Sequence, residues 1–421
     1  MNNNLYPERH ILSIDLKSFF ASCECVSRNL NPFEVPLVVA NPNQGQGAIT
    51  LAVTPFLKKK GVKSRGRLYE IPKNIKYIIV PPRMSLYIEF SKKVIYVYLY
   101  YVSKEDLHVY SIDECFLDVT HYLKLYKKND YELAEEILKS ITEKTGLTAN
   151  CGIGPNILIA KIAMDVEAKL YKNGIAKWTY DDVKNKLWKL NPLSKMWGIG
   201  PRMEKKLNNL RIFSVGDLAK FDKNILKNKF GVMGVELWEH ANGIDLTTIS
   251  DLSKHQPDKS YSNSQILFKD YNGNNVEIII REMVDIVTKR LRQNNKQGSV
   301  IGLLIGYSKS VGGGFYHVLK LDVPTDDIRI IFDTCMMIFD KYYTNKPIRK
   351  VGVSIGNLSQ KDCMQLSIFE SVDEVEKIDN ANKVIDRITE RFGKNSLLKA
   401  SALLEESTIR DRNKKIGGHN A

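Results

Sequence analysis

The sequence lacks the cysteine patterns that mark metal-binding or disulfide-stabilised domains. It holds 6 cysteines among 421 residues, and no two of them form a C-x-x-C pair. The 7 histidines do not cluster near the cysteines, so the sequence gives no support for a zinc site. A chain of this length buries a core without disulfide bonds, and we expect reduced thiols in a cytosolic protein. The cysteines are at positions 23, 25, 115, 151, 335 and 363.

The sequence also lacks targeting and membrane signals. The first residues, MNNNLYPERH, contain no apolar signal core, and no apolar run is long enough to span a bilayer. We find no internal repeat and no low-complexity tract. These absences predict a soluble, cytoplasmic protein with no membrane partner.

What the sequence has in excess is positive charge. Its 62 Lys and Arg residues outnumber its 48 Asp and Glu residues, which gives a formal net charge of +14. Hydrophobic residues make up 43% and charged residues 26%, which is a normal globular composition. A basic chain of this size often binds a polyanion, with nucleic acid first in line. The alternative is a generic basic protein of an AT-rich genome, and charge alone does not separate the two.

The length is too great for one ordinary core, and the periodicity predicts several domains. Alternating strands and helices run to about residue 189 and indicate a mixed α/β domain. Residues 191–251 predict short helices joined by Gly-rich turns, and residues 252–258 resemble a linker. A β-α-β-β-α-β module and a helix-prone tail to residue 421 follow. Strands of this module are expected near 261–268, 299–307, 315–322 and 350–357, and its helices at 275–293 and 325–343.

Three carboxylates fall at the ends of predicted strands. Asp15 ends the apolar run 10–14, and Asp113 and Glu114 lie between two further apolar segments. Adjacent side chains on a regular strand point to opposite faces, so Asp113 and Glu114 serve one site only where the strand ends or turns. Three oxygen ligands and a backbone carbonyl suit a hard cation such as Mg²⁺. On these residues alone, ordinary exposed turn residues remain the alternative.

The two segments that carry these acids resemble the palm motifs of the Y-family DNA polymerases. They are I-D-L-K-S-F-F-A-S-C-E at 14–24 and Y-S-I-D-E-C-F-L-D at 110–118. The resemblance is nearest to the bacterial UmuC- and UvrX-type branch and runs over essentially the whole chain. Further matching segments are G-I-G-P-N-I-L-I-A-K at 152–161, F-G-V-M-G-V-E-L-W-E-H-A-N-G-I-D at 230–245 and R-N-K-K-I-G-G-H at 412–419.

The resemblance implies a template-directed, low-fidelity DNA polymerase that performs translesion synthesis on damaged DNA and lacks proofreading. The implied fold is a multi-domain α+β right-hand polymerase. It has a mixed α/β palm, small fingers, a helical thumb with a helix-hairpin-helix, and a βαββαβ little finger. The implied domains are the palm (1–20 and 82–190), fingers (21–81), thumb (191–251), linker (252–259), little finger (260–358) and a tail with a clamp-binding motif (359–421).

The resemblance also implies a metal site. Asp15, Asp113 and Glu114 would bind two Mg²⁺ ions, with the Leu16 carbonyl as a further ligand. Asp15 and Asp113 would bridge both ions, and Glu114 would serve the catalytic one. Two such ions about 3.5–4 Å apart activate a 3′-hydroxyl and stabilise the leaving pyrophosphate.

The nucleotide contacts follow from the same resemblance. Phe20 matches the family's steric gate, since an aromatic ring against the sugar C2′ leaves no room for a 2′-hydroxyl, and Phe19 would pack beneath the triphosphate end. Lys58 and Lys161 match cations that reach the triphosphate from the fingers and the palm, where they would neutralise phosphate charge. Without the resemblance, a core residue beside Phe19 would be the favoured interpretation of Phe20.

DNA contacts are expected in two places. W-G-I-G-P-R at 197–202 resembles a helix-hairpin-helix turn, in which Gly198, Gly200 and Arg202 would approach a phosphate. In the third module, basic residues would track the duplex backbone. A plain helix connector and a solvated helix face are the respective alternatives. The basic residues of the third module are Lys289, Arg290 and Arg292.

The tail contains a pentapeptide that resembles the peptides bound by the bacterial sliding clamp. Gln365 would hydrogen-bond at the edge of the clamp pocket, while Leu366, Ile368 and Phe369, with Ser367 between them, would fill apolar pockets. Binding would raise the local concentration of a weakly processive enzyme at the primer end. The alternative is that these apolar residues pack the tail onto the protein itself.

Two other classes of protein share parts of this pattern. Nucleotidyl cyclases have palm-like domains with paired carboxylates, but they have no use for the thumb turn, the third module or the tail. A non-catalytic DNA-binding relative is the second alternative, although all three acids are present here. Primer-template DNA and deoxynucleoside triphosphates are the expected substrates. A damage-response recombinase or small accessory subunits are further partners that the sequence leaves open.

Overall fold

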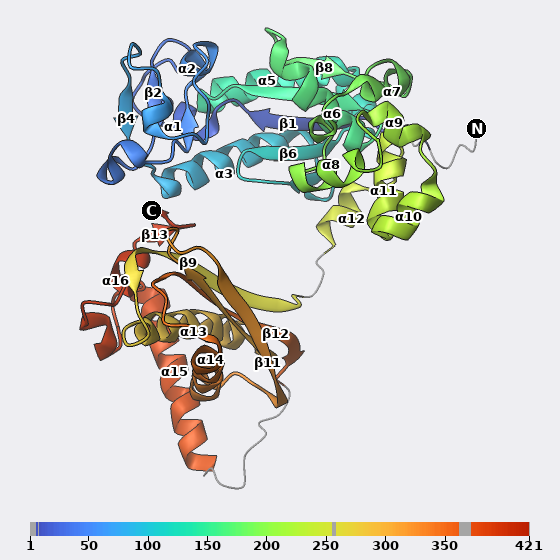
Figure 1. Cartoon of the computed structure of the whole chain (residues 1–421). Helices are drawn as coiled ribbons and strands as arrows, with labels where there is room; N and C mark the ends of the chain where they lie inside the picture. Colours follow the sequence, from blue (N-terminus) through green and yellow to red (C-terminus); the bar gives the residue numbers. More distant parts are fainter. Residues whose placement is uncertain (1–5, 7, 255–257, 362–371, 421) are drawn as a thin grey trace. The chain divides into compact units, whose positions relative to one another are not determined.

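The computed structural model describes residues 6, 8–254, 258–361 and 372–420 (Figure 1). The chain divides into two compact units, Met1–Lys254 with His419–Ala421, and His255–Gly418. None of the helices within these described ranges combines the length and the apolar character that a membrane crossing requires.

The centre of the first unit is a five-stranded sheet with the strand order β5-β6-β1-β7-β8. Its middle strand β1 (Ile11–Leu16) is antiparallel to both β6 (Glu114–Asp118) and β7 (Ala149–Gly154). At the edges, β5 (Leu107–Val109) is antiparallel to β6, and β8 (Ile175–Lys177) is parallel to β7. Nearly all of β1 is buried, which accounts for the four apolar residues among its six.

One face of this sheet packs on three helices that form a large core. Alternate residues of β1, from Leu12 to Leu16, share this core with α1 (Phe19–Val26), α3 (Met84–Tyr101) and α5 (Asp130–Thr145). The buried residues of α3 and α5 recur every three or four positions, as expected of helices with one face in a core.

The opposite face of the sheet is covered by α6 (Ile157–Val166), which lies very close to β7. A Cβ atom on Gly152 would lie 2.1 Å from the Ala160 carbonyl oxygen, and one on Gly154 would lie 2.5 Å from the Ala160 nitrogen. Neither distance is compatible with a side chain, so glycine at both positions permits the helix to rest directly on the strand.

A set of short helices packs against the outer side of α6. Leu158 and Ile162 of α6 share a core with these helices. The segment after α11 also holds the N-terminus of α6: the Asn156 amide donates to the Gly243 carbonyl (2.9 Å), and the Asp245 carboxylate accepts from the Leu158 N–H (3.1 Å). The set comprises α7 (Asp181–Asn185), α8 (Pro201–Asn208), α9 (Val215–Lys220), α10 (Lys223–Phe230) and α11 (Val232–Ala241). α12 (Ile249–Ser253) packs instead with Ile11 and Phe116 of the sheet.

A second, smaller sheet with the order β3-β2-β4 lies in the segment predicted as fingers. β2 (Leu37–Val39) is antiparallel to β3 (Ala52–Val53) and parallel to β4 (Ile78–Val80), and α2 (Pro55–Lys59) joins its core. Further short helices of the first unit are η2 (Pro42–Gly47), η3 (Leu68–Glu70), η4 (Lys104–Asp106), α4 (Leu123–Tyr126), η5 (Ala168–Leu170), η6 (Leu187–Lys189) and η7 (Leu193–Lys195).

The second unit has the predicted β-α-β-β-α-β order, which is thereby confirmed. Its four strands form an antiparallel sheet in the order β11-β10-β12-β9, and its two helices share one core with the sheet. The elements are β9 (Ser260–Tyr271), α13 (Val276–Gln293), β10 (Lys296–Tyr307), β11 (Gly314–Thr325), α14 (Ile328–Tyr342) and β12 (Ile348–Gln360). The finer domain boundaries proposed for palm, fingers, thumb and little finger stay predictions.

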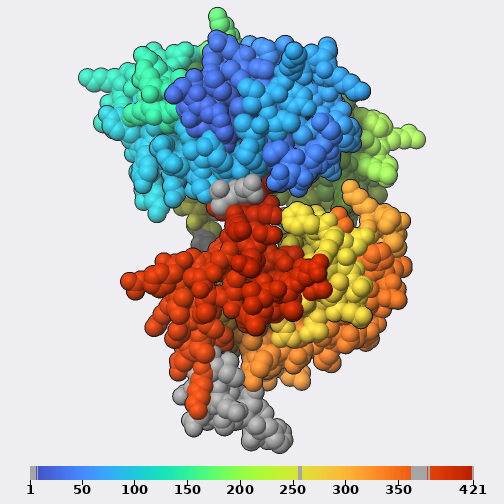
Figure 2. Space-filling model, turned by 90° about the vertical axis from the view of Figure 1, so that its left-hand side faces the viewer, coloured from blue at the N-terminus to red at the C-terminus, as the bar shows by residue number. Residues whose placement is uncertain are grey.

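The tail returns to the second unit, and Figure 2 shows it (red) on the surface of that unit. α15 (Val372–Phe392) stops before Gly393, whose φ of 96° is a conformation that favours glycine. The predicted helix-prone tail is therefore one long helix as far as Phe392, and the described residues beyond it form short elements. The later elements are η8 (Ala400–Leu403), α16 (Ile409–Arg412), β13 (Lys415–Ile416) and β14 (His419–Asn420).

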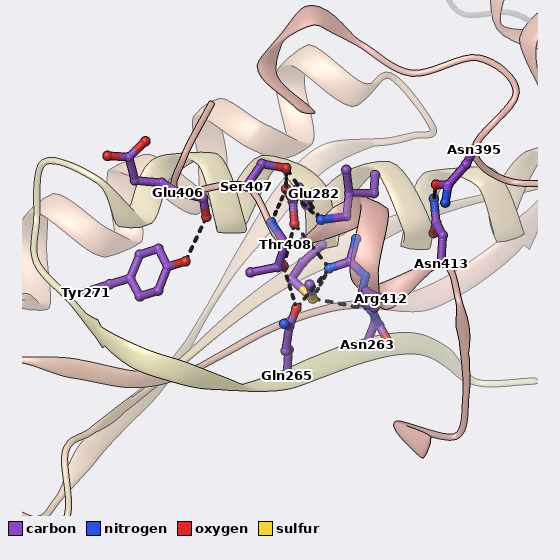
Figure 3. Close-up of polar contacts among 12 residues, drawn as sticks. Asn263, Gln265, Tyr271, Glu282, Asn395, Glu406, Ser407, Thr408, Arg412 and Asn413 are labelled. Carbon is purple, nitrogen blue, oxygen red and sulfur yellow. Dashed lines mark hydrogen bonds and ion pairs between the residues drawn. The ribbon is translucent and has the colours of Figure 1, made fainter. Parts of the chain in front are cut away.

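One buried carboxylate, that of Glu282 on α13, anchors the tail (Figure 3). It accepts hydrogen bonds from the backbone N–H groups of Thr408 (3.0 Å) and Ile409 (3.3 Å). It also accepts from the hydroxyls of Ser407 (2.6 Å) and Thr408 (2.9 Å), and Arg412 lies 3.4 Å away. Because the first N–H groups of a helix have no partner within the helix, Glu282 acts as a cap for α16 from elsewhere in the chain.

Candidate active site

The three predicted acids lie together at one end of the strand pair β1–β6. Asp15 and Glu114 are direct cross-strand partners, and Asp113 lies in the turn just before β6. The Leu16 N–H donates to the Asp113 carbonyl (3.0 Å), and the Ser111 hydroxyl donates to the Asp113 carboxylate (2.7 Å). The turn therefore holds Asp113 beside the end of β1. This is the strand end at which the adjacent residues Asp113 and Glu114 can both face one site.

Two lysines on the α6 side of the sheet neutralise part of this acidic edge. Lys161, in the middle of α6, forms an ion pair with Glu114 and lies 3.0 Å from Asp165. Lys169, in η5, lies 2.7 Å from Asp165 and 3.4 Å from Asp15. The Lys161 side chain is only 8% exposed, so its charge acts in a poorly solvated environment.

Burial shifts the protonation of these groups. Burial raises the pKa of Asp15, and the neighbouring charge of Asp113 raises it further. Burial likewise raises the pKa of Glu114, even though its ion pair acts in the opposite direction. Burial alone would lower the pKa of Lys169, but the carboxylates of Asp15 and Asp165 outweigh it and raise the pKa. The edge thus holds more negative charge than its surroundings can easily solvate.

The residues at this edge fit a divalent cation by their chemistry. Four carboxylates lie at this edge, and the ammonium groups of Lys161 and Lys169 form ion pairs with three of them. The carboxylates are those of Asp15, Asp113, Glu114 and Asp165. Carboxylate oxygens are the ligands that Mg²⁺ prefers, and a cation would offset the cost of burying their charge. Within residues 6, 8–254, 258–361 and 372–420, no three His, Cys, Asp or Glu side chains already form a metal cluster. Glu114 in particular is paired with Lys161.

An aromatic stack lies just after the acidic strand end. Phe20 is partly buried and stacks on Tyr87 of α3, with ring centroids 4.4 Å apart and planes inclined by 14°. The Tyr87 hydroxyl donates to Glu24 (2.7 Å), and this hydrogen bond fixes the Tyr87 ring of the stack. Phe19 is buried in the core of the first unit, and its predicted place beneath a triphosphate stays a prediction.

Lys58 occupies the last turn of α2 with an exposed side chain. Partial desolvation lowers its pKa, while the charges of Asp15 and Asp113 act against this shift. The charges of Asp15 and Asp113 therefore act on Lys58 although it belongs to the helix of the smaller sheet. This position is compatible with the predicted phosphate contact.

The W-G-I-G-P turn leads into α8, as a helix-hairpin-helix would require. Gly198 has a φ of 90°, Gly200 is the residue before the helix, and a Cβ on either would meet no atom within 4 Å. Trp197 fixes the turn by packing against Phe116 of β6, with ring centroids 6.1 Å apart. Arg202 is exposed in the first turn of α8. The backbone of this turn is therefore open to a ligand on its outer side.

The basic residues predicted to track DNA on α13 have other partners. Arg292 is 12% exposed and lies 2.8 Å from Asp386 of α15. Lys289 donates to the Thr389 hydroxyl (2.7 Å) on the same helix. Arg290 donates to the Ser262 carbonyl (2.9 Å). At least Lys289 and Arg292 thus hold the tail helix on α13, and their contact with DNA stays a prediction without support from the fold.

The predicted clamp-binding residues 365–369 lie outside the described residues. β12 ends at Gln360 before this segment, and α15 begins at Val372 after it.

Asp165 and Lys169 were not predicted as site residues. Their signal in the sequence is the regular spacing of Lys161, Asp165 and Lys169, four residues apart, which places alternating charges along one helix face. The spacing shows a charged stripe, but only the fold reveals that this stripe faces the acids.

The sequence matches three models of one family. The impB/mucB/samB family matches residues 14–165, and its C-terminal domain matches residues 258–368. The IMS family HHH motif matches residues 180–212, a range that includes the W-G-I-G-P turn.

Named relatives align with nearly the whole chain. UvrX of Bacillus subtilis (strain 168), named for repair of UV damage, is 41% identical over 417 residues, which is 98% of each chain. DNA polymerase IV 2 of the same organism is 33% identical over 419 residues, covering 99% of this chain and 100% of the relative. Among solved structures, a Y-family DNA polymerase chimera of Dbh and Dpo4 covers 83% of this chain and 99% of its own, with 21% identity and a TM-score of 0.64. This likeness confirms the predicted multi-domain α+β fold.

Proposed function

The chain belongs to the impB/mucB/samB family of Y-family DNA polymerases, and we propose that Asp15, Asp113 and Glu114 form its catalytic edge. It is a DNA-directed DNA polymerase of the translesion class, which acts on DNA and deoxynucleoside triphosphates. Low fidelity and the lack of proofreading are general features of this family.

A single observation supports this location of the catalytic edge. Asp15 and Glu114 are cross-strand partners, and the hydrogen bond from the Leu16 N–H holds Asp113 beside them. Three carboxylates at one strand end, with raised pKa values for two of them, are an unstable arrangement unless a cation shares their charge.

The family uses divalent metal ions generally, and we propose two Mg²⁺ ions held by Asp15, Asp113, Glu114 and the Leu16 carbonyl. When bound, such ions lower the pKa of the primer 3′-hydroxyl and stabilise the charge of the leaving pyrophosphate. Before they bind, Lys161 and Lys169 supply the positive charge at this edge. Glu114 must therefore give up its pairing with Lys161 to become a ligand.

The nucleotide would lie between the acids and the aromatic stack. Phe20, whose ring stacks on Tyr87, would exclude a nucleotide with a 2′-hydroxyl from the site. Lys161 and the additional Lys169, which form ion pairs with the acids, would neutralise the phosphates, and Lys58 would do so from the fingers.

Further contacts complete the proposal. The open backbone around Gly198 and Gly200, with Arg202, would hold a DNA phosphate. Residues 365–369 would bind the sliding clamp, and a damage-response recombinase or small accessory subunits are further candidate partners. A DNA substrate also supports the predicted cytoplasmic location.

Primer extension tests the proposal directly. The protein is incubated with a primer-template, Mg²⁺ and single deoxynucleoside triphosphates, and product length and pyrophosphate are measured. Replacement of Asp113 or Glu114 by Ala should lower the rate by roughly 10²–10³-fold and leave DNA binding intact. Normal extension by the variant with both Asp113→Ala and Glu114→Ala would refute the assignment. Nucleotide consumption without a primer would indicate a cyclase, and DNA binding without extension a non-catalytic relative.

A further inference from the structure

Five charged side chains beside the proposed catalytic edge alternate in sign. Lys161 links Glu114 of β6 to Asp165 at the end of α6. Lys169 links Asp165 to Asp15 of β1. Asp15 and Glu114, the two acidic ends of this series, are cross-strand partners. Asp165 is the member that lies within ion-pair distance of both lysines.

The position of Asp165 on α6 accounts for this double contact. It follows Lys161 by one helical turn and precedes Lys169 by another four residues, so one carboxylate reaches both ammonium groups at 3.0 and 2.7 Å. The three side chains are 8%, 32% and 40% exposed for Lys161, Asp165 and Lys169. An exposed helical pair of the same spacing, Glu89 and Lys93, is 59% and 52% exposed. The pairs around Asp165 are thus more strongly desolvated than an ordinary surface pair, which contributes little.

We propose that Asp165 is a positioning residue for the triphosphate of the incoming deoxynucleotide. It holds Lys161 and Lys169 beside the acids, where both ammonium groups compensate Glu114 and Asp15 in the free enzyme. Once divalent cations bind the acids, the same ammonium groups would contact the triphosphate. This inference rests on the proposed polymerase function and adds a residue that acts through the two lysines.

The need for such a residue follows from the exchange of partners. A lysine whose only partner is a catalytic acid is left without a fixed position when that acid binds a cation. Its long side chain would then have to be ordered by the triphosphate alone, at a cost in conformational entropy. Asp165 keeps one contact to each lysine throughout, so the ammonium groups are already placed when the nucleotide arrives.

The test measures nucleotide binding without chemistry. The full chain, as wild type and as Asp165→Asn and Asp165→Glu, is bound to a labelled primer-template whose primer ends in a dideoxynucleotide. The dissociation constant of the next correct deoxynucleoside triphosphate is then measured in Mg²⁺ by fluorescence. Loss of the carboxylate charge should raise this constant roughly tenfold in Asp165→Asn. Asp165→Glu should restore most of the affinity, and the dissociation constant for DNA should not change.

Two comparisons separate positioning from general damage. Glu89→Gln removes a helical ion pair of the same spacing on α3 and should leave nucleotide binding unchanged. Lys169→Gln, which leaves α6 intact, should weaken binding of the deoxynucleoside triphosphate but not of the corresponding monophosphate. In the double variant, its effect on the dissociation constant should not add fully to that of Asp165→Asn. Strict additivity, or equal loss for both nucleotides, would overturn the inference.

The outcomes distinguish this inference from the function on which it rests. A wild-type protein that neither extends primers nor binds the triphosphate would refute the proposed function itself. Normal binding by the wild type together with an unchanged constant in Asp165→Asn would refute only the positioning role. If Asp165→Asn does not fold, the triphosphate-to-monophosphate comparison for Lys169→Gln decides the matter.

Discussion

Replacing Gly152 by Ala should dislocate α6 from the central sheet. The new Cβ would lie 2.1 Å from the Ala160 carbonyl oxygen and 2.3 Å from the Met164 nitrogen. Both are backbone atoms, so no side chain can turn away, and the helix has to move by about 1 Å to restore normal contact distances. Alanine gains roughly 0.5–1 kcal/mol over glycine in a strand because the unfolded chain is less free. Overpacking against rigid backbone costs about 3 kcal/mol or more, so the net effect is destabilising.

The assay exploits the distribution of tryptophan. All 4 tryptophans, at positions 178, 188, 197 and 238, lie in the first unit, so their fluorescence during urea unfolding reports on that unit. Gly152→Ala should lower its free energy of unfolding by about 2 kcal/mol or more, and it should slow primer extension because α6 carries Lys161 and Asp165. Gly47→Ala is the matched control, since a Cβ there meets no atom within 4 Å, and it should be neutral or slightly stabilising. Equal stability of the two variants would refute the packing argument.

Three further predictions concern other parts of the chain. Phe20→Ala should raise ribonucleotide incorporation at least about tenfold while deoxynucleotides are still used, and an unchanged sugar preference would show that Phe20 only packs on the neighbouring ring. Changing Leu366 and Phe369 to Ala together should abolish stimulation by the sliding clamp without affecting short-primer extension, whereas surviving stimulation would place the contact elsewhere. Glu282→Ala should increase amide hydrogen exchange at Thr408 roughly tenfold or more, because the tail loses its buried acceptor. Unchanged protection there would mean that apolar packing holds the tail.

The sequence predicted best those features that depend on local patterns. The strand ending at Asp15 and the βαββαβ module follow from periodicity, and both are present. The turn between two apolar segments was sufficient to place Asp113 and Glu114 at one strand end. That these acids bind metal is still a prediction, because it depends on a partner exchange by Lys161 that no sequence pattern reports.

The features that escaped prediction depend on contacts between distant segments. Lys289 and Arg292 have the spacing of an open basic face, but a helix about a hundred residues later supplies their partners. Likewise, Lys169 is an ordinary surface lysine by sequence and becomes a partner of Asp15 only because α6, which η5 follows, packs against β1. Which charges are free and which are paired is a property of tertiary structure.

The capping of α6 limits how this enzyme can be divided into exchangeable parts. The Gly243 carbonyl and the Asp245 carboxylate hold the start of a helix that bears Lys161 on the other side of the predicted palm–thumb boundary. A hybrid protein that joins this palm to the thumb of a relative would therefore need the same two partners at the same places, or its α6 would lose its cap. Recombination points for such hybrids are better placed after residue 245 than near residue 190. Over evolutionary time, the same dependence would make the A-N-G-I-D segment change together with α6 rather than with the surface of the thumb.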